Sequence, residues 1–256
     1  MDLGLAGRVV LITGAGGGAG PTIAATFARE GAIVALHGRT PGSSAEPSRA
    51  EAAAAEIVTG GGQAFAVAAD LGSTDEVATM IAAIEKRAGA VAVLVTATSA
   101  YRNDKFPEIT DDAWASVIDD MLGAAFRVAR AVVPGMQAAG FGRIVNIAAR
   151  SGLVGVSRAA HYAAAKAGII ALTTSLAKEL GPQGILVNAV APTQVLTHKD
   201  GKPSIPDERA AEMAKAIPIR RLATPDDLAA VVLWLGSAAN TYVSGETVSL
   251  TGGAQS

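Results

Sequence analysis

The sequence contains no cysteine among its 256 residues. This absence excludes a disulfide scaffold, a thiolate metal site, an iron–sulfur cluster and a cysteine nucleophile. The three histidines, His37, His161 and His198, do not have the spacing of metal ligands, and no G-x-S-x-G nucleophile elbow is present. Hydrolase and metalloenzyme chemistries are therefore poorly supported.

The sequence also lacks an excess of either charge, since 21 basic against 23 acidic side chains give a formal net charge of −2. A nucleic acid or an anionic membrane would favour a basic excess. The longest uncharged stretches, 181–198 and 228–245, are interrupted by proline, glycine or asparagine, and the first residues lack the basic region and apolar core of a signal peptide. We expect a soluble cytoplasmic protein with no nucleic-acid or membrane partner.

Aromatic residues are scarce at 4%, whereas half of the chain is apolar and 29 residues are glycine. Short β-branched runs alternate with longer helical patterns; the runs are 8–13, 33–36, 64–68, 91–96, 143–148, 185–190 and 247–250. Nearly continuous apolar runs are typical of strands buried on both faces of a parallel sheet. The alternation predicts an α/β fold, a Rossmann-type doubly wound parallel sheet of about seven strands with helices on both faces.

No repeat or linker divides the chain, so we expect one nucleotide-binding domain over residues 1–256. Segment 40–48, rich in proline, glycine and serine, predicts a loop that leads into an alanine-rich helix near 51–58. Segment 192–205 has the weakest periodicity, and a helical pattern over 207–216 follows it. Long loops in compact domains are commonly lids, which predicts a substrate loop or lid at about 193–217; a surface excursion is the alternative.

A glycine-rich segment closes the first predicted strand, and a helix is expected to begin at Pro21. Glycines let the backbone turn sharply and approach a pyrophosphate, and the helix N-terminus favours negative charge. A purely structural turn is the alternative, but the position after the first strand favours a nucleotide site. The predicted cofactor contacts in this loop are Thr13, Gly14, Gly18, Ala19 and Gly20.

The end of the second strand reads Leu-His-Gly-Arg-Thr over residues 36–40, without a carboxylate for the ribose hydroxyls of NAD. Arg39 offers a planar, permanently charged group that suits a 2′-phosphate, so NADP(H) is favoured over NAD(H). A solvated loop arginine is the alternative reading. Asp70, followed by Leu71 after the third strand, could accept a hydrogen bond from adenine or cap the next turn, and both residues are predicted cofactor contacts.

Tyr162 and Lys166 lie four residues apart in an alanine-rich helical stretch, which places them on one helix face. An ammonium near a phenol stabilises the phenolate and lowers its pKa from a reference value of about 10. The tyrosine then becomes a usable acid or base. Alone, such a pair is commonly an incidental surface contact. Together with the upstream glycine loop, it indicates a catalytic pair beside a nucleotide site.

Together these motifs resemble the classical short-chain dehydrogenase/reductase family, and 3-oxoacyl-acyl-carrier-protein reductases in particular, over nearly the whole chain. The matching features are the loop 13–20, Asp70, Asn146, the Tyr162/Lys166 pair, the segment 188–192 and Ser244 with Gly245. The resemblance implies that Tyr162 is the acid/base at the substrate oxygen and that Lys166 binds the nicotinamide ribose. It also implies that Val195 and Thr197 contact the nicotinamide carboxamide or the phosphate region and that Pro192 is a cofactor contact. Helices around 114–133 and 161–180 are implied to build a homotetramer or homodimer.

The sequence departs from the family at two catalytic positions. The family's serine falls on Ala149 and its asparagine falls on Met121. Losing one donor at a developing oxyanion costs on the order of 3 to 4 kcal/mol unless another group replaces it. Ser151 ranks first as a substitute donor, because two residues along an extended strand return to the same face.

Other candidate donors follow the fourth strand, where the family's Asn-Asn-Ala-Gly reads Thr-Ala-Thr-Ser over residues 96–99. Ser99, Thr98 and Tyr101 rank second because they leave the sheet near the same end. His161 adjoins Tyr162, but neighbours on a helix diverge, so we expect it to line another part of the cleft or to pack structurally.

The leading functional hypothesis is an NADP(H)-dependent oxidoreductase that interconverts a carbonyl and a secondary alcohol, with Tyr162 as acid/base and Lys166 as its activator. One alternative keeps the fold but catalyses a dehydration, an isomerisation or a cyclisation, which needs no oxyanion serine. Another is a non-catalytic nucleotide-binding protein. The sequence does not identify the small-molecule substrate.

Overall fold

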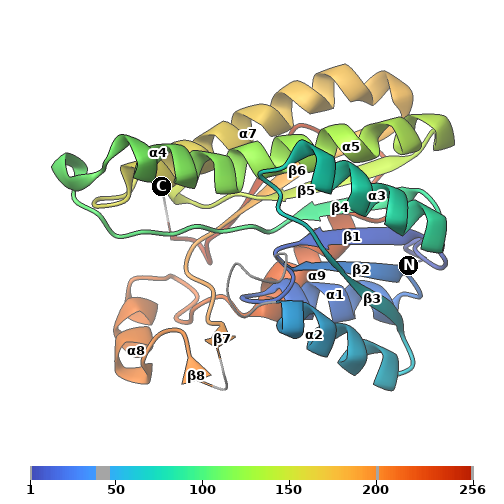
Figure 1. Ribbon diagram of the computed structural model, residues 1–256. Helices are drawn as coiled ribbons and strands as arrows, with labels where there is room; N and C mark the ends of the chain where they lie inside the picture. The colour runs from blue at the N-terminus through green and yellow to red at the C-terminus, as the bar shows by residue number, and fades with distance from the viewer. Residues whose placement is uncertain (1, 39–46, 200–201, 255–256) are drawn as a thin grey trace.

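The computed structural model describes residues 2–38, 47–199 and 202–254. Seven strands form one sheet in the order β3-β2-β1-β4-β5-β6-β9, and every neighbouring pair is parallel (Figure 1). The strands are β1 (Val9–Thr13), β2 (Ile33–Gly38), β3 (Gln63–Ala68), β4 (Val91–Thr96), β5 (Gly142–Ile147), β6 (Ile185–Pro192) and β9 (Thr247–Leu250). The predicted doubly wound parallel sheet is confirmed.

Helices cover both faces of the sheet (Figure 1). One layer holds α1 (Gly20–Arg29), α2 (Pro47–Thr59) and α9 (Pro225–Leu235). The other layer holds α3 (Thr74–Ala88), α4 (Asp111–Ile118), α5 (Ala124–Ala139) and α7 (Ala160–Leu180). Two further helices are α6 (Ser151–Val154) and α8 (Asp207–Lys215).

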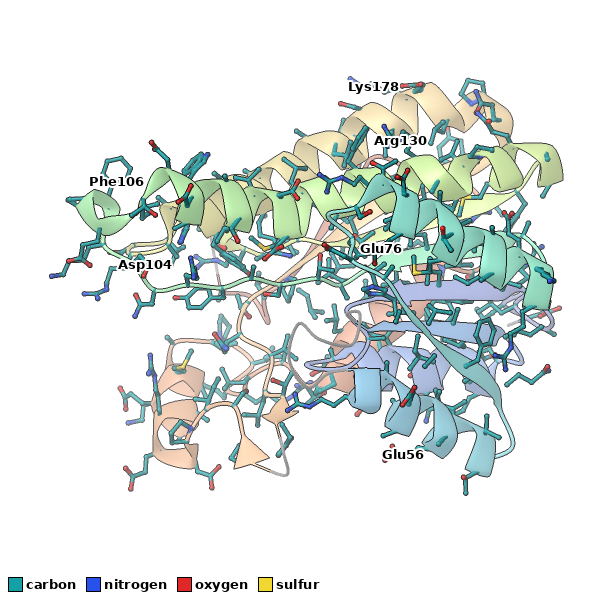
Figure 2. All side chains as sticks on the ribbon, in the orientation of Figure 1. Glu56, Glu76, Asp104, Phe106, Arg130 and Lys178 are labelled. Carbon is teal, nitrogen blue, oxygen red and sulfur yellow. The ribbon has the colours of Figure 1, made fainter. Side chains whose placement is uncertain are left out.

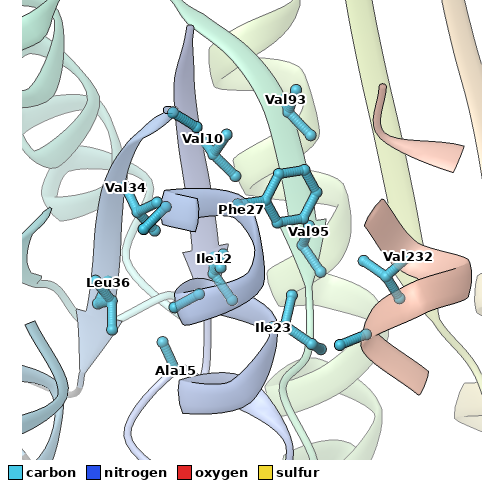
Figure 3. Close-up of a cluster of buried hydrophobic side chains, with 14 of the residues drawn as sticks. Val10, Ile12, Ala15, Ile23, Phe27, Val34, Leu36, Val93, Val95 and Val232 are labelled. Atoms are coloured by element: carbon cyan, nitrogen blue, oxygen red, sulfur yellow. The ribbon is translucent and has the colours of Figure 1, made fainter. Parts of the chain in front are cut away.

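The alternation of side chains along β1 divides the core into two halves. Val10 and Ile12 pack with Phe27 of α1 and Val232 of α9, as Figure 3 shows. Val9 and Leu11 of β1 point to the opposite face and pack against α3 and α5. Because both faces of this central strand are buried, its sequence reads as a continuous apolar run.

The helix starts follow local capping chemistry. Pro21 lies in the first turn of α1, where its missing N–H has no intrahelical partner in any case. The side chain of Ser73 accepts a hydrogen bond from the backbone N–H of Glu76 at the start of α3. The start of α1 agrees with the sequence prediction to within one residue, because a helix start depends on residues only a few positions apart.

The strand order reverses at the junction of β1 and β4. The chain runs from β1 outward through β2 and β3, and then returns to place β4 on the other side of β1. Ligands of such sheets bind outside the carboxyl ends of the strands at this switch point. The loops that follow Thr13 and Thr96 therefore border the same crevice.

The predicted lid region contains more regular structure than its sequence indicates. A two-stranded antiparallel sheet joins β7 (His198–Lys199) to β8 (Lys202–Pro203), and α8 follows. Ile205, Ile217 and Leu222 form a small apolar cluster of their own. Two-residue strands carry too little periodicity to be recognised from sequence.

Within residues 2–38, 47–199 and 202–254, no helix combines the length and the apolar character that a bilayer crossing requires.

Candidate active site

A cleft of about 1090 Å³ opens at the carboxyl ends of the central strands. The glycine loop, the ends of β2 and β3, the segment after β4, and α7 all contribute to its walls. Most of the predicted site residues meet there, namely Gly14, Gly18, Ala19, Gly20, Asp70, Leu71, Tyr162, Lys166, Pro192, Val195 and Thr197. The strand order thus gathers motifs that are scattered along the sequence.

The glycine loop needs glycine at two positions for steric reasons. Gly14 has φ +67°, and a Cβ on it would lie 2.9 Å from the carbonyl oxygen of Ala97. A Cβ on Gly20 would lie 2.7 Å from the Cα of Ala15. Gly18 has φ +59° and open space around the position of a Cβ. The loop therefore presents bare backbone and the N-terminus of α1 to the cleft, which fits a pyrophosphate.

Thr13 does not line the cleft, although the sequence predicts a cofactor contact there. The residue is buried, and its hydroxyl oxygen accepts a hydrogen bond of 3.3 Å from the backbone N–H of Ala97. Its carbonyl oxygen accepts from the same N–H at 3.2 Å. Thr13 thus ties the end of β1 to the segment that follows β4.

His37 joins three strand ends beneath the cleft, a role that sequence reasoning missed. Its buried ring accepts a hydrogen bond at Nδ1 from the N–H of Gly14, 3.3 Å away. With that tautomer, Nε2 donates to the carbonyl oxygen of Ala69, 3.0 Å away. The only available signal was a polar residue at the end of an apolar strand.

Asp70 lines the cleft and serves a local turn as well. One of its carboxylate oxygens accepts a hydrogen bond of 2.9 Å from the N–H of Gly72, and its own N–H donates to the carboxylate of Glu76 at 2.7 Å. Figure 2 labels Glu76 on α3. Asp70 therefore lines the cleft and closes a turn, while Arg39 lies outside the described residues.

Lys166 is held rigidly at the bottom of the cleft. The side chain is 2% exposed, and Nζ donates hydrogen bonds to the carbonyl oxygens of Ile147 (2.7 Å) and Thr98 (3.3 Å). Nζ lies 5.8 Å from the centre of the Tyr162 ring. Desolvation by burial lowers the pKa of Lys166 to about 8.

The pKa of Tyr162 differs from the expectation of the sequence. Burial raises the pKa of the phenol above its ordinary value, and this effect outweighs a hydrogen bond from the Ser99 side chain that lowers it. The neighbouring Tyr101 adds to the rise, and its ring meets that of Tyr162 edge to face with 5.2 Å between centroids. In this structure the phenol is therefore stabilised as the neutral acid.

The two positions at which the family has serine and asparagine hold apolar, buried residues in this chain, Ala149 and Met121. Ala149 lines the cleft beside the Tyr162/Lys166 pair. Met121 is fully buried in a π-helical turn, Asp119–Gly123, between α4 and α5, and belongs to the same apolar cluster as Tyr162. Short π-helical turns inside α-helices are frequent at functional sites.

The ranking of Ser151 as the first substitute donor assumes that an extended strand runs from Ala149 to Ser151, and the structure has no strand there. β5 ends at Ile147, the chain turns, and Ser151 begins the short helix α6 instead of continuing the strand. Its hydroxyl is buried without a hydrogen-bond partner, and the residue does not line the cleft. Ser99 and Thr98, which ranked second, do line it.

Two further polar residues line the cleft from the helical layer. Ser116 lies on α4 and Asp120 lies in the π-helical turn, and neither was predicted as a site residue. The available signal was only their place in a helix that precedes Met121. Both residues therefore add polar side chains to the lining of the cleft.

His161 takes the structural role that the sequence offered as one possibility. Its side chain is fully buried, and Nε2 lies 3.3 Å from a carboxylate oxygen of Asp104. Figure 2 shows Asp104 on the segment between β4 and α4. The residue does not line the cleft. Across the described residues, no group of three or more His, Cys, Asp or Glu side chains could hold a metal ion.

A family model described as enoyl-(acyl carrier protein) reductase matches residues 14–255. The chain belongs to the short-chain dehydrogenase/reductase family. It is 34% identical over 251 residues to the 3-oxoacyl-[acyl-carrier-protein] reductase FabG of Pseudomonas aeruginosa, covering 98% of each chain. It is 33% identical over 246 residues to Nodulation protein G of Azospirillum brasilense, covering 96% of this chain and 97% of that protein.

The fold of this short-chain dehydrogenase/reductase agrees with a solved structure. A crystal structure of a proposed gluconate dehydrogenase from Agrobacterium tumefaciens superimposes with a TM-score of 0.91 at 30% sequence identity. The match covers 99% of this chain and 98% of the other. Similarity of this extent supports the same strand order.

Proposed function

We propose that this short-chain dehydrogenase/reductase uses NADP(H) to interconvert a carbonyl compound and a secondary alcohol. One observation carries the proposal: Tyr162 and the buried ammonium of Lys166 lie together in a cleft that begins at a glycine loop. A nucleotide site without a reactive side chain would need no such pair. The names of the bacterial relatives favour a 3-oxoacyl compound as substrate.

The residues of the cleft fit a nicotinamide dinucleotide in an extended arrangement. The loop of Gly14, Gly18, Ala19 and Gly20 would hold the pyrophosphate, and Asp70 with Leu71 would border the adenine. Lys166 would bind the nicotinamide ribose, and Pro192, Val195 and Thr197 would border the nicotinamide. When bound, this group supplies the hydride, so the protein must orient the substrate and move the proton.

Tyr162 moves that proton. In the direction of reduction, the phenol O–H breaks as the substrate C=O π bond opens, and a new O–H bond forms on the substrate oxygen. The phenolate that remains is stabilised by the ammonium of Lys166, whose position is fixed by its bonds to Ile147 and Thr98. Because burial raises the pKa of Tyr162, the residue begins the reaction as an acid.

The preference for NADP(H) rests on Arg39 and on the end of β2. That end offers no carboxylate, and both ring nitrogens of His37 are bonded to backbone atoms of Gly14 and Ala69. His37 therefore has no ring nitrogen left for a ribose hydroxyl. We infer that Arg39 meets the 2′-phosphate.

The remaining parts of the proposal concern the whole chain. Residues 1–256 form one nucleotide-binding domain, and segment 193–217 covers the substrate, since its first residues line the cleft and its hairpin and α8 carry their own apolar cluster. The chain works as a cytoplasmic homotetramer or homodimer. Exposed Trp114 and Phe126 on the α4–α5 layer support such an assembly.

Nucleotide binding is tested by fluorescence titration with NADPH and NADH, followed by assay of carbonyl compounds, beginning with ethyl acetoacetate. We expect tighter binding of NADPH, and a loss of turnover of about 100-fold or more in Tyr162→Phe with unchanged NADPH affinity. Absence of binding to either nucleotide, or full turnover in the variant, would overturn the proposal.

A reaction without net redox change is the second candidate, and the apolar Ala149 beside Tyr162 favours it. A dehydration, isomerisation or cyclisation could use the tyrosine without a second hydroxyl at that position. Substrate conversion with constant nicotinamide absorbance would identify this chemistry, whereas conversion coupled to loss of NADPH absorbance would exclude it.

A further inference from the structure

The segment that follows β4 contacts both members of the reactive pair. The carbonyl oxygen of Thr98 accepts a hydrogen bond of 3.3 Å from Lys166 Nζ. The next residue, Ser99, lines the cleft with Tyr162, and its side chain lowers the pKa of that phenol. The ring of Tyr101 packs edge to face on the ring of Tyr162. This short segment thus contacts Lys166 through Thr98 and Tyr162 through Tyr101, with Ser99 between the two.

We propose that Ser99 supplies the hydroxyl that orients the Tyr162 phenol during proton transfer, in place of the absent side-chain hydroxyl at position 149. The inference rests on the proposed oxidoreductase function and names a positioning residue for the same site. Ser99 lines the cleft together with Tyr162, Lys166 and Ala149, and it lies on the wall formed by the segment after β4.

The base of this segment is tied to the helix that carries Tyr162. Thr96 donates from Oγ1 to the side-chain oxygen of Asn146 over 2.7 Å, and Asn146 donates to Oγ1 of Thr173 on α7 over 2.9 Å. All three side chains are buried. The N–H of Ala97 also donates to Thr13. A buried, fully paired chain of this kind holds the Ser99 segment and α7 in a fixed relation.

The other hydroxyl near this position cannot take the same role in this structure. Ser151 lies at the start of α6, is not part of the cleft wall, and has a buried hydroxyl without a hydrogen-bond partner. It therefore provides a matched control, since its substitution removes a nearby serine hydroxyl that does not contact Tyr162.

The chemical step leaves the serine unchanged. As the Tyr162 O–H bond breaks and the substrate O–H bond forms, the Ser99 O–H donates a hydrogen bond to the phenolate oxygen and keeps its own proton. A hydrogen bond to the charged form favours that form. The same bond already opposes the rise that burial imposes on the pKa of Tyr162.

The first test follows the ionisation of Tyr162 by ultraviolet absorbance and needs no substrate. The Tyr162 transition is identified by its loss in Tyr162→Phe, since the chain has only three tyrosines. We expect Ser99→Ala to move this transition to higher pH, Ser99→Thr to restore it, and Ser151→Ala to leave it unchanged. An unchanged transition in Ser99→Ala, or an equal change in Ser151→Ala, would overturn the inference.

The second test measures NADPH oxidation with ethyl acetoacetate. Ser99→Ala should lower kcat about tenfold with little change in KM, because the lost hydrogen bond acts on the transition state. Adding Ala149→Ser should restore most of the rate, whereas adding Ser151→Ala should have no effect. Equal kcat in wild type and Ser99→Ala would overturn the inference, while turnover that survives Tyr162→Phe would instead overturn the proposed function.

Discussion

Lys166 shows how much of the site depends on one buried charge. Its ammonium is almost completely removed from solvent and is compensated by two carbonyl oxygens instead of a carboxylate. Carbonyl dipoles compensate only part of the desolvation cost, which is why burial lowers the pKa of the amine to about 8.

The lowered pKa of Lys166 predicts a pH-dependent stability. Between about pH 8 and the ordinary lysine value, the unfolded chain binds a proton that the folded protein has released, so stability rises with pH in this window. Relative to Lys166→Met, the free energy of unfolding of the wild type should rise by about 2 to 3 kcal/mol from pH 8 to pH 10. Urea denaturation at several pH values measures this difference.

Lys86→Met is the matched control for that experiment, because Lys86 is exposed in the last turn of α3. The wild type and Lys86→Met should give parallel profiles of unfolding free energy against pH. Parallel profiles for the wild type and Lys166→Met would show that the buried amine keeps an ordinary pKa.

At the scale of elements, a glycine can be needed for its backbone conformation or for the close approach of a ligand, and a comparison of Gly18 with Gly61 distinguishes the two. Gly18 and Gly61 both have positive φ, and both have open space at the position of a Cβ. Only Gly18 lines the cleft, whereas Gly61 lies in the turn between α2 and β3.

Alanine at either glycine should therefore cost a similar stability, roughly 1 kcal/mol, because an L-residue is strained at positive φ. Only Gly18→Ala should weaken NADPH binding, by about tenfold or more, since its Cβ would occupy the space where the pyrophosphate approaches the backbone. Fluorescence titration and thermal unfolding of both variants test this. Equal NADPH affinities would exclude the loop as the phosphate site.

Helix α9 begins with a reciprocal capping arrangement. The Thr224 hydroxyl accepts from the N–H of Asp227, and the Asp227 carboxylate accepts from the N–H of Thr224. Arg221 also binds this carboxylate and holds the pKa of Asp227 well below its ordinary value. The helix packs against α1 through buried residues that include Val232.

Removing this cap by Thr224→Ala should lower the free energy of unfolding by about 1 kcal/mol, because the backbone N–H of Asp227 loses its acceptor. Thr79→Ala is the control, since Thr79 is exposed in the middle of α3 and bonds only to its own helix. Chemical denaturation measures both variants. Equal losses would show that the capping arrangement adds no stability.

For the whole molecule, both helical layers leave large apolar side chains exposed, and those of the α4–α5 layer include two aromatic residues. Trp114 and Phe126, on α4 and in the α5 helix, are 43% and 45% exposed. Figure 2 shows Phe106 near the end of the same layer, and it is 75% exposed. Large exposed apolar side chains on one layer are typical of an interface between subunits.

We therefore expect Trp114→Glu combined with Phe126→Glu to reduce the molecular mass in solution toward that of one chain, with an unchanged circular dichroism spectrum. Val58→Glu is the control, because Val58 is exposed on α2 in the opposite layer. Light scattering after size-exclusion chromatography measures the mass. A wild type that is already a monomer would contradict the proposed assembly.

The sequence by itself determined the seven strands and the start of α1, because these depend on side-chain patterns within a few consecutive residues. It also identified the glycine loop and the Tyr162/Lys166 pair as parts of one site. Its strand ends agree with the structure to within two residues, and among the strands of the described residues only the short β7 and β8 were not predicted.

Only the tertiary structure determined which polar side chains lie close to one another in the cleft. Whether Ser151 or Ser99 approaches Tyr162 depends on the turn after β5 and on the placement of β4 beside β1, neither of which is encoded in local periodicity. The same holds for His37, whose partners lie on segments distant in sequence. Burial, which sets the pKa of Lys166, likewise arises only when the sheet and α7 pack together.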